Sequence, residues 1–186
     1  MKYENMKLED LFLLAKKGDG KAFEQIVLLT ERSVYNLALS ILKNKENAED
    51  VTQETYLRLW RTVTVTDIGS PRSYILRTAR NLALDHLRKS SRSAEVDAEL
   101  EFEPEDTSAE SRPDLSYLQM LEAEAIRESI AELPQSAREI IILRDVERLP
   151  YSEIAKMLEI SEGTLKSKLY RARERLRQII ISKNIL

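Results

Sequence analysis

Apolar residues recur every three or four positions through most of the chain, which is the spacing of amphipathic helices. In the first half this pattern predicts four helices. Asp19 and Asn47 are suited to cap the second and third of them, and Pro71 fits the first turn of the fourth. The predicted helices are 8–17, 21–43, 47–62 and 71–89.

The second half is again helical from Tyr117 onward, and Pro134 opens its second helix. Its strongest signal is a short predicted helix over 152–158, a tight turn, and a last helix that begins at Glu162 with Ser161 as its cap. Several apolar positions here fit the packing of a helix-turn-helix. They are Ile154, Ala155, Leu158, Ile160 and Leu165.

The segment 93–116 separates these halves and carries one basic and nine acidic residues, with two prolines and few apolar side chains. Such a composition buries too little apolar surface to fold alone, so it predicts a flexible acidic linker. The predicted fold class is therefore all-α, with two small helical domains joined by this linker and a helix-turn-helix in the second. The predicted boundaries are 1–92, 93–116 and 117–186.

Composition narrows the chemistry of the chain. Its 186 residues include no cysteine and one histidine, His86, which excludes disulfides, thiolate metal sites and zinc sites built from several imidazoles. The sequence contains no apolar run near the roughly 18 residues of a membrane span. We therefore expect a cytoplasmic protein. The sequence has no nucleotide-binding loop, nucleophile constellation or metal site, and no heptad or large apolar patch that suggests dimerisation, so we also expect a monomer that is not an enzyme and needs neither metal nor cofactor.

The net charge of −3 hides an uneven distribution. Residues 71–92 carry six basic and one acidic residue, and residues 161–186 carry seven and two. Each of these basic segments has a net charge of +5, whereas the linker has −8. Two basic segments around an acidic one indicate contact with a polyanion at two places, although a basic helix is sometimes only a solvated face.

The third predicted helix places acidic and apolar residues on one face, which Gln53 and Trp60 border. This combination suits a protein partner with a basic, partly apolar surface. The alternative is that Leu57 and Trp60 belong to the core and the carboxylates are only solvated. The face consists of Asp50, Glu54, Leu57 and Arg61.

The fourth predicted helix interleaves cations with an aromatic ring and an amide, a pattern that suits single-stranded nucleic acid. Alternatively, Tyr74 packs in the core and Asp85 pairs with Arg88 or Lys89 at helix spacing. The candidate residues are Tyr74, Arg77, Arg80, Asn81, Asp85, Arg88 and Lys89.

The last predicted helix has cations along both rims of its exposed side, as a helix in a major groove requires. Its N-terminal part holds the best candidates for contact with base edges. The candidate residues are Ser161, Glu162, Thr164, Lys166, Ser167, Arg171, Arg173 and Arg175.

Three stretches occur in order across the linker: NAEDVTQETYLRLWR, RSYILRTARNLALDHLRK and LPQSAREIIILRDVERLPYSEIAKMLEISEGTLKSKLYRARERLR. Together they resemble bacterial RNA polymerase sigma factors of the extracytoplasmic-function (ECF) type, over about residues 6–180. The family often has glycine where this chain has Glu159, at a turn where a left-handed conformation costs about 1 kcal/mol or more.

The resemblance implies a role for each surface. The face of the third helix would bind the clamp helices of the polymerase's largest subunit, and the fourth helix would capture the opened minus-ten strand. The second domain would read the minus-thirty-five element and meet the flap of the other large subunit. The resemblance also implies regulation by an anti-sigma factor, which can hold the protein at the membrane. The genes it controls would belong to a stress or envelope regulon. The alternative is a stand-alone helix-turn-helix regulator, which would bind duplex DNA as a dimer without polymerase.

Overall fold

The computed structural model describes residues 3, 5–64, 69–93 and 117–183, and the side chains of 91–93 and 117–122 are left out of that description. The chain forms two compact units, Met1–Glu99 and Leu100–Leu186. Every regular element in the described ranges is helical, so the all-α, two-domain prediction is confirmed. The predicted linker lies outside the described residues except for Ser93, which still belongs to the fourth helix.

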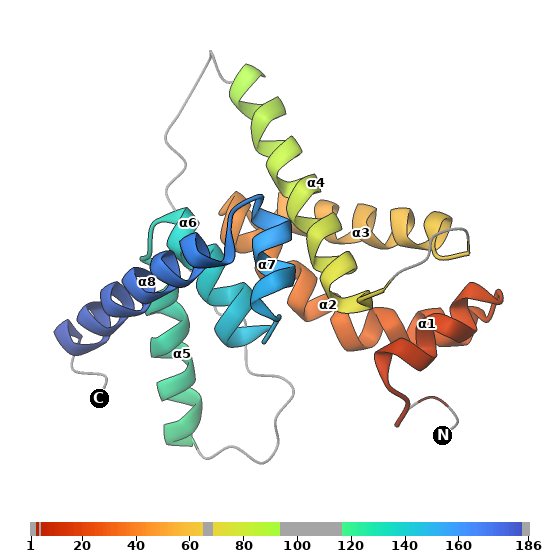
Figure 1. Cartoon of the computed structure of the whole chain (residues 1–186), viewed down its shortest axis with the longest axis horizontal. Helices are drawn as coiled ribbons and strands as arrows, with labels where there is room; N and C mark the ends of the chain where they lie inside the picture. The colour runs from red at the N-terminus through yellow and green to blue at the C-terminus, as the bar shows by residue number, and fades with distance from the viewer. Residues whose placement is uncertain (1–2, 4, 65–68, 94–116, 184–186) are drawn as a thin grey trace. The chain divides into compact units, whose positions relative to one another are not determined.

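The first unit is built around one long central helix, α2, which contacts the other three helices (Figure 1). The last helix, α4, also contacts α1 and α3, and its final turns extend past the other helices in the view of Figure 1. The helices are α1 (Leu8–Lys16), α2 (Gly20–Leu42), α3 (Lys45–Thr62) and α4 (Pro71–Ser93).

Local sequence explains where these helices begin. The Asp19 carboxylate accepts hydrogen bonds from the backbone N–H groups of Lys21 and Ala22, which confirms it as the cap of α2. The predicted cap at Asn47 is wrong, because Asn44 holds that place and accepts from the Asn47 N–H at 2.9 Å. Lys43 ends α2 in a left-handed conformation, and Asn44 follows it directly as the N-cap of α3.

The core of the first unit is mostly aliphatic, and a buried polar contact joins α2 to α3. The Thr30 hydroxyl donates to the Ile26 carbonyl at 2.6 Å and lies 2.9 Å from the Tyr56 hydroxyl. Burial raises the pKa of Tyr56. The largest fully buried side chains here are Leu11, Ile26, Leu37, Leu59, Ile75 and Leu76.

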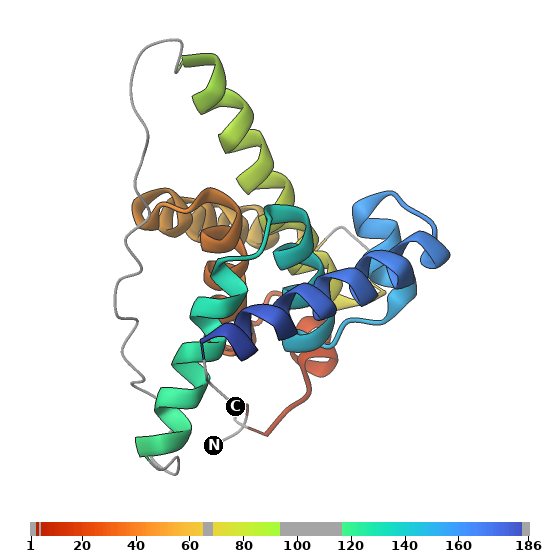
Figure 2. The ribbon, with the colours of Figure 1, turned by 90° about the vertical axis from the view of Figure 1, so that its left-hand side faces the viewer.

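The second unit packs its helices around α8, with α7 beside the N-terminal end of that helix (Figure 2). Pro134 directly precedes α6, as predicted, but the π-helical turn that follows α6 was not predicted. The elements are α5 (Tyr117–Ala131), α6 (Gln135–Ile141), the π-helix η1 (Ile142–Val146), α7 (Tyr151–Leu158) and α8 (Glu162–Ser182).

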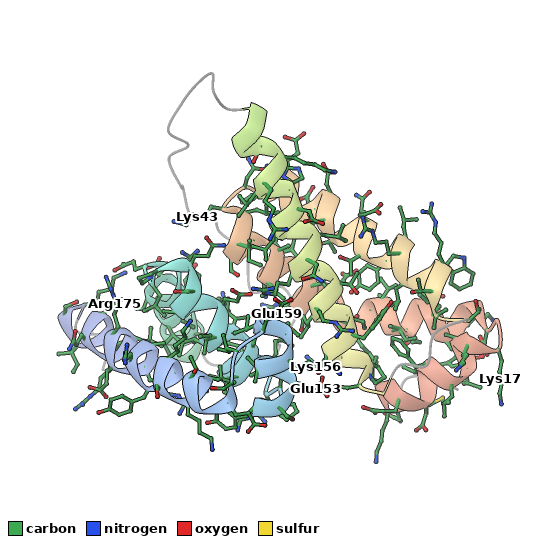
Figure 3. The ribbon with its side chains drawn as sticks, turned by 45° about the horizontal axis from the view of Figure 1, so that its top comes forward. Lys17, Lys43, Glu153, Lys156, Glu159 and Arg175 are labelled. Atoms are coloured by element: carbon green, nitrogen blue, oxygen red, sulfur yellow. The ribbon has the colours of Figure 1, made fainter. Side chains whose placement is uncertain are left out.

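The helix-turn-helix consists of α7, the turn after it and α8. Glu159 takes the predicted left-handed conformation, with φ of 55°, and ends α7; its position is labelled in Figure 3. Ser161 caps α8 as predicted, since its hydroxyl accepts from the Thr164 N–H at 3.1 Å. Leu158 and Ile160 are only half-buried, whereas the other three positions of the predicted packing pattern are buried.

One cation lies inside the second unit. Arg138 is 3% exposed, and its guanidinium donates two hydrogen bonds to the Leu133 carbonyl at 3.3 and 2.9 Å. Burial lowers the pKa of Arg138. The contact ties α6, which packs on α8, to the connection between α5 and α6.

Among the described residues, none of the helices is both long and apolar enough to cross a membrane.

Candidate functional site

The exposed face of α3 carries the first candidate surface. Asp50, Gln53 and Arg61 are exposed, and Glu54 is half-buried beside Arg58, to which it forms an ion pair of 2.9 Å. Leu57 lies among them with 52% of its surface exposed. The alternative that Leu57 belongs to the core is therefore wrong. The five predicted residues form one acidic and partly apolar surface.

Trp60 extends this surface toward α2. Its indole ring is 47% exposed and lies edge-to-face on the ring of Phe23, with 4.8 Å between the ring centroids. Such a pair holds a large aromatic side chain in one place without burying it. Trp60 is thus presented to solvent in a fixed position, and it is not a core residue.

Six of the seven candidate residues of α4 share one face of the helix, and Arg80 lies outside it. At about 100° per residue, six of them fall within about 120° of one another, and Arg80 lies about 120° from Tyr74. Tyr74 is half-buried, its hydroxyl lies 3.2 Å from that of Thr62, and the Arg77 guanidinium is 5.9 Å from its ring centroid. Tyr74 therefore contacts α3 and also borders the exposed face.

Asp85 forms an ion pair with Arg88 at 3.1 Å, and both side chains are exposed. This is the helix-spaced pairing that the sequence offered as an alternative role for Asp85. The pair sits on the same side of α4 as Asn81, which is also exposed.

A shallow hollow of about 270 Å³ joins the two candidate surfaces of the first unit. It brings Arg61, predicted to contact a protein, next to Tyr74 and Asn81, predicted to contact nucleic acid. Three further residues were not predicted, because they meet only when the last turn of α3 packs on the first turns of α4. The lining residues are Arg58, Arg61, Thr62, Tyr74, Thr78 and Asn81.

His86 lies on the inner side of α4, about 120° from Tyr74. Its Nδ1 atom is buried and has no hydrogen-bond partner in the described part of the chain. No group of three or more potential metal ligands occurs among the described residues.

The outward side of α8 carries the third candidate surface. Every one of its eight predicted residues is exposed. Ser161 and Ser167 are engaged locally, in the helix cap and in a 3.1 Å hydrogen bond to the Gly163 carbonyl. Tyr170, which the prediction left out, is 69% exposed and stands between the two basic rims.

Arg173 differs from the other cations of α8. Its Nε atom donates to an Asp145 carboxylate oxygen at 3.0 Å, and a second guanidinium nitrogen donates to the other oxygen. The hydrogen bond to Asp145 raises the pKa of Arg173. This contact joins α8 to η1 across 28 residues of sequence, so helix periodicity alone does not reveal it.

Tyr151, the first residue of α7, lies between two cations. The Arg144 guanidinium is 4.5 Å from its ring centroid and the Lys166 ammonium is 5.8 Å away. Both distances suit cation–π attraction. Arg144 and Tyr151 were not among the predicted residues, because they flank α8 from other elements.

Comparison with known proteins assigns both units. The family model "Sigma-70 region 2" matches residues 26–93, and "Sigma-70, region 4" matches residues 123–176. The ECF RNA polymerase sigma factor SigW of Bacillus subtilis is 31% identical over 170 residues, which cover 88% of this chain and 91% of that protein. SigM, another ECF RNA polymerase sigma factor of the same organism, is 29% identical over 84% of this chain and 93% of its own length.

Solved structures share the fold. The sigma factor RpoE of Bartonella quintana, in a complex with the anti-sigma factor NepR, has a TM-score of 0.70 at 24% identity. The match covers 86% of this chain and 97% of that one. With a 31% identical relative matched over most of both lengths, the chain belongs to the ECF RNA polymerase sigma factor family.

Proposed function

We propose that this chain binds core RNA polymerase, directs it to specific promoters and promotes opening of the DNA so that transcription begins. The observation that carries this proposal is the hollow between α3 and α4, where Arg61 of the acidic face adjoins Tyr74 and Asn81. One small surface would then touch the polymerase and an unpaired DNA strand together. Such a surface couples polymerase binding to strand capture.

The α3 face supports binding to a protein. Asp50 and Glu54 offer negative charge beside exposed Leu57 and Trp60, and buried aromatic or aliphatic anchors with charged rims are typical of binding hot spots. The partner of this surface is the pair of clamp helices of the largest polymerase subunit, bound through Asp50, Gln53, Glu54, Leu57 and Arg61.

The α4 face supports binding to unpaired bases. Tyr74 and Arg77 offer a stacking platform and a cation, and Asn81 offers amide donors and acceptors at the edge of the hollow. Stacking on an aromatic side chain is worth about 1–3 kcal/mol per base, which offsets the cost of unstacking. The minus-ten strand would be held by Tyr74, Arg77, Arg80, Asn81, Asp85, Arg88 and Lys89.

The α8 surface supports binding to duplex DNA. It is exposed and basic along both rims, as a helix in a major groove requires. The minus-thirty-five element would be contacted by Ser161, Glu162, Thr164, Lys166, Ser167, Arg171 and Arg175, and Arg173 serves this surface through Asp145. The same unit would meet the flap of the other large subunit.

The chain acts by binding open promoter DNA more strongly than closed promoter DNA, and the polymerase core carries out catalysis. We further propose that the protein acts as a cytoplasmic monomer and serves a stress or envelope regulon. We also propose that an anti-sigma factor regulates it, in some conditions from the membrane. Two solved structures of the same fold support this regulation, since RpoE is bound to the anti-sigma factor NepR and CnrH to the cytosolic domain of CnrY.

Run-off transcription with core polymerase tests the proposal, on a pool of genomic fragments with and without this protein. We expect discrete transcripts that depend on the added chain. A chain that binds duplex DNA tightly alone, but yields no new transcript with core polymerase, would instead favour the stand-alone regulator.

A further inference from the structure

The contact between Arg173 and Asp145 carries an inference about how α8 is oriented. Arg173 offers two nitrogens to the two oxygens of one carboxylate, a fork-to-fork geometry that fixes direction as well as distance. Both side chains are partly shielded, with 50% of Arg173 and 34% of Asp145 exposed. An ion pair of this geometry and partial shielding is more than a solvated surface pair.

The position of Arg173 on α8 also indicates a partly shielded side chain. At about 100° per residue it lies about 40° from the buried Leu169 and about 160° from Arg171. Arg173 thus borders the packed side of the helix. Arg171 faces away from the packed side and makes no ion pair with any described residue.

The element that supplies Asp145 is itself unusual. Asp145 belongs to the π-helical turn η1, and π-helical turns place side chains differently from a continued α-helix. In the same region Tyr151 of α7 lies between Arg144 of η1 and Lys166 of α8. Side-chain contacts therefore tie α8 to α7 through Lys166 and to η1 through Arg173.

We propose that Arg173 is a positioning residue, which with Asp145 fixes α8 against η1 so that Arg171 and its neighbours meet the DNA. It contacts no phosphate itself. This inference rests on the proposed function, because it concerns how the minus-thirty-five surface is held. It assigns Arg173 a different role from the phosphate or base contact that its sequence position suggests.

Salt dependence separates the two roles. A residue that neutralises one phosphate contributes about −0.9 to the slope of log Kobs against log salt. The double variant Asp145→Asn/Arg173→Gln removes the ion pair without changing the net charge. Arg171→Gln, two residues away on the exposed side, is the matched control. Asp145→Arg/Arg173→Asp restores the pair with its charges exchanged.

The experiment uses the full chain assembled with core RNA polymerase. The probes are a fluorescein-labelled duplex, selected by the unmodified holoenzyme from a random-sequence pool, and the unselected pool. Binding is measured by anisotropy between 50 and 200 mM NaCl, and circular dichroism checks that each variant is folded.

We expect the neutral double variant to bind the selected duplex about fivefold more weakly, with unchanged binding to the unselected pool and an unchanged salt slope. The exchanged pair restores the selectivity. Arg171→Gln makes the slope of log Kobs against log salt less negative by about 0.9. Arg173→Lys, which keeps the charge but loses the planar fork, loses part of the selectivity.

A salt slope that becomes less negative by about 0.9 in the double variant would overturn the proposal, because it would mean that a phosphate contact was lost. An exchanged pair that stays defective would overturn it as well. If Arg173→Lys binds like the unmodified chain, a point charge is sufficient and the positioning role is also overturned. A holoenzyme that selects no duplex at all would overturn both this inference and the proposed minus-thirty-five role.

Discussion

The two basic helices α4 and α8 have similar net charge along the sequence but different surfaces in the fold. The candidate face of α4 is interrupted by a half-buried ring, an amide and a hollow shared with α3. The outward side of α8 has exposed cations on both rims and an exposed Tyr170 between them. A recess beside a ring suits single bases, whereas a convex basic helix suits an intact groove.

The difference teaches that the net charge of a helix does not by itself say which form of nucleic acid its surface suits. The shape of the surface depends on the elements that pack beside the helix. The last turn of α3 stands over the first turns of α4 and creates a recess, whereas α7 and η1 flank α8 and leave its outer side open.

The largest expected effect is the loss of polymerase binding in Asp50→Arg/Glu54→Arg. Reversing two charges on a surface whose partner is basic should weaken core binding about a hundredfold or more, because interface hot spots each contribute about 2 kcal/mol or more. Co-purification with core polymerase and a binding titration measure this. Duplex binding through α8 should not change.

The matched control for that variant is Glu9→Arg/Asp10→Arg, which reverses two exposed charges on α1. The control should bind polymerase normally. If both double variants lose binding equally, net charge rather than the α3 face determines the interaction.

Tyr74→Ala tests the recess and should reduce open-complex formation about tenfold, since a stacked base is worth about 1–3 kcal/mol. Permanganate reactivity of unpaired thymines measures it. Tyr74→Phe keeps the ring and loses only the contact with Thr62, so it should retain most of the activity. A template with a pre-opened minus-ten region should restore the alanine variant in part; no restoration would place the defect elsewhere.

Arg171→Gln tests the outer side of α8 and should weaken binding to promoter duplex about fivefold. The variant should open a pre-bound promoter normally. Footprinting of the upstream element, compared with permanganate reactivity downstream, distinguishes the two steps. Equal losses at both steps would contradict separate surfaces.

The smallest expected effect concerns the interior that holds α3 against α2. Tyr56→Phe removes the hydroxyl that lies 2.9 Å from Thr30 and should lower the free energy of unfolding of the first unit by about 1 kcal/mol. Urea denaturation followed by the fluorescence of Trp60, the one tryptophan of the chain, measures this unit. The second unit should keep its stability.

The same residue predicts a pH dependence. Burial raises the pKa of Tyr56 above its usual value of about 10, so the neutral phenol is favoured in the folded state. The contribution of this pKa shift to the free energy of unfolding is fully present below pH 10. It is lost as the pH rises above that value. The unmodified first unit should therefore lose stability above pH 10 more steeply than Tyr56→Phe; equal slopes would contradict the burial of this hydroxyl.

Local features were predictable from the sequence because their causes are local. Asp19 and Ser161 cap helices through side chains two or three residues from their partners, and Glu159 occupies the left-handed turn position that the helix-turn-helix pattern requires. Helix periodicity placed Leu57 beside Asp50 and Glu54 but left its burial open, and the structure decides that it is exposed. The Asn44 cap did not, since Asn44 and Asn47 are equally suited and only the left-handed Lys43 decides between them.

Features that need tertiary contacts were not predictable from the sequence. Arg58, Thr62 and Thr78 became site residues only through the packing of α3 on α4. The ion pair of Arg173 was not predictable either, because helix periodicity does not reveal a partner 28 residues away in a π-helical turn. Helix periodicity thus predicts which residues share an exposed face, whereas contacts with other elements depend on the tertiary fold.

The central claim is that the first unit holds polymerase and the unpaired strand while the second selects the duplex. Transcription by reconstituted holoenzyme tests it most directly, on one promoter fragment supplied either fully paired or pre-opened at the minus-ten region. We predict that pre-opening rescues Tyr74→Ala but leaves Arg171→Gln impaired. Equal rescue of both variants would contradict the claim.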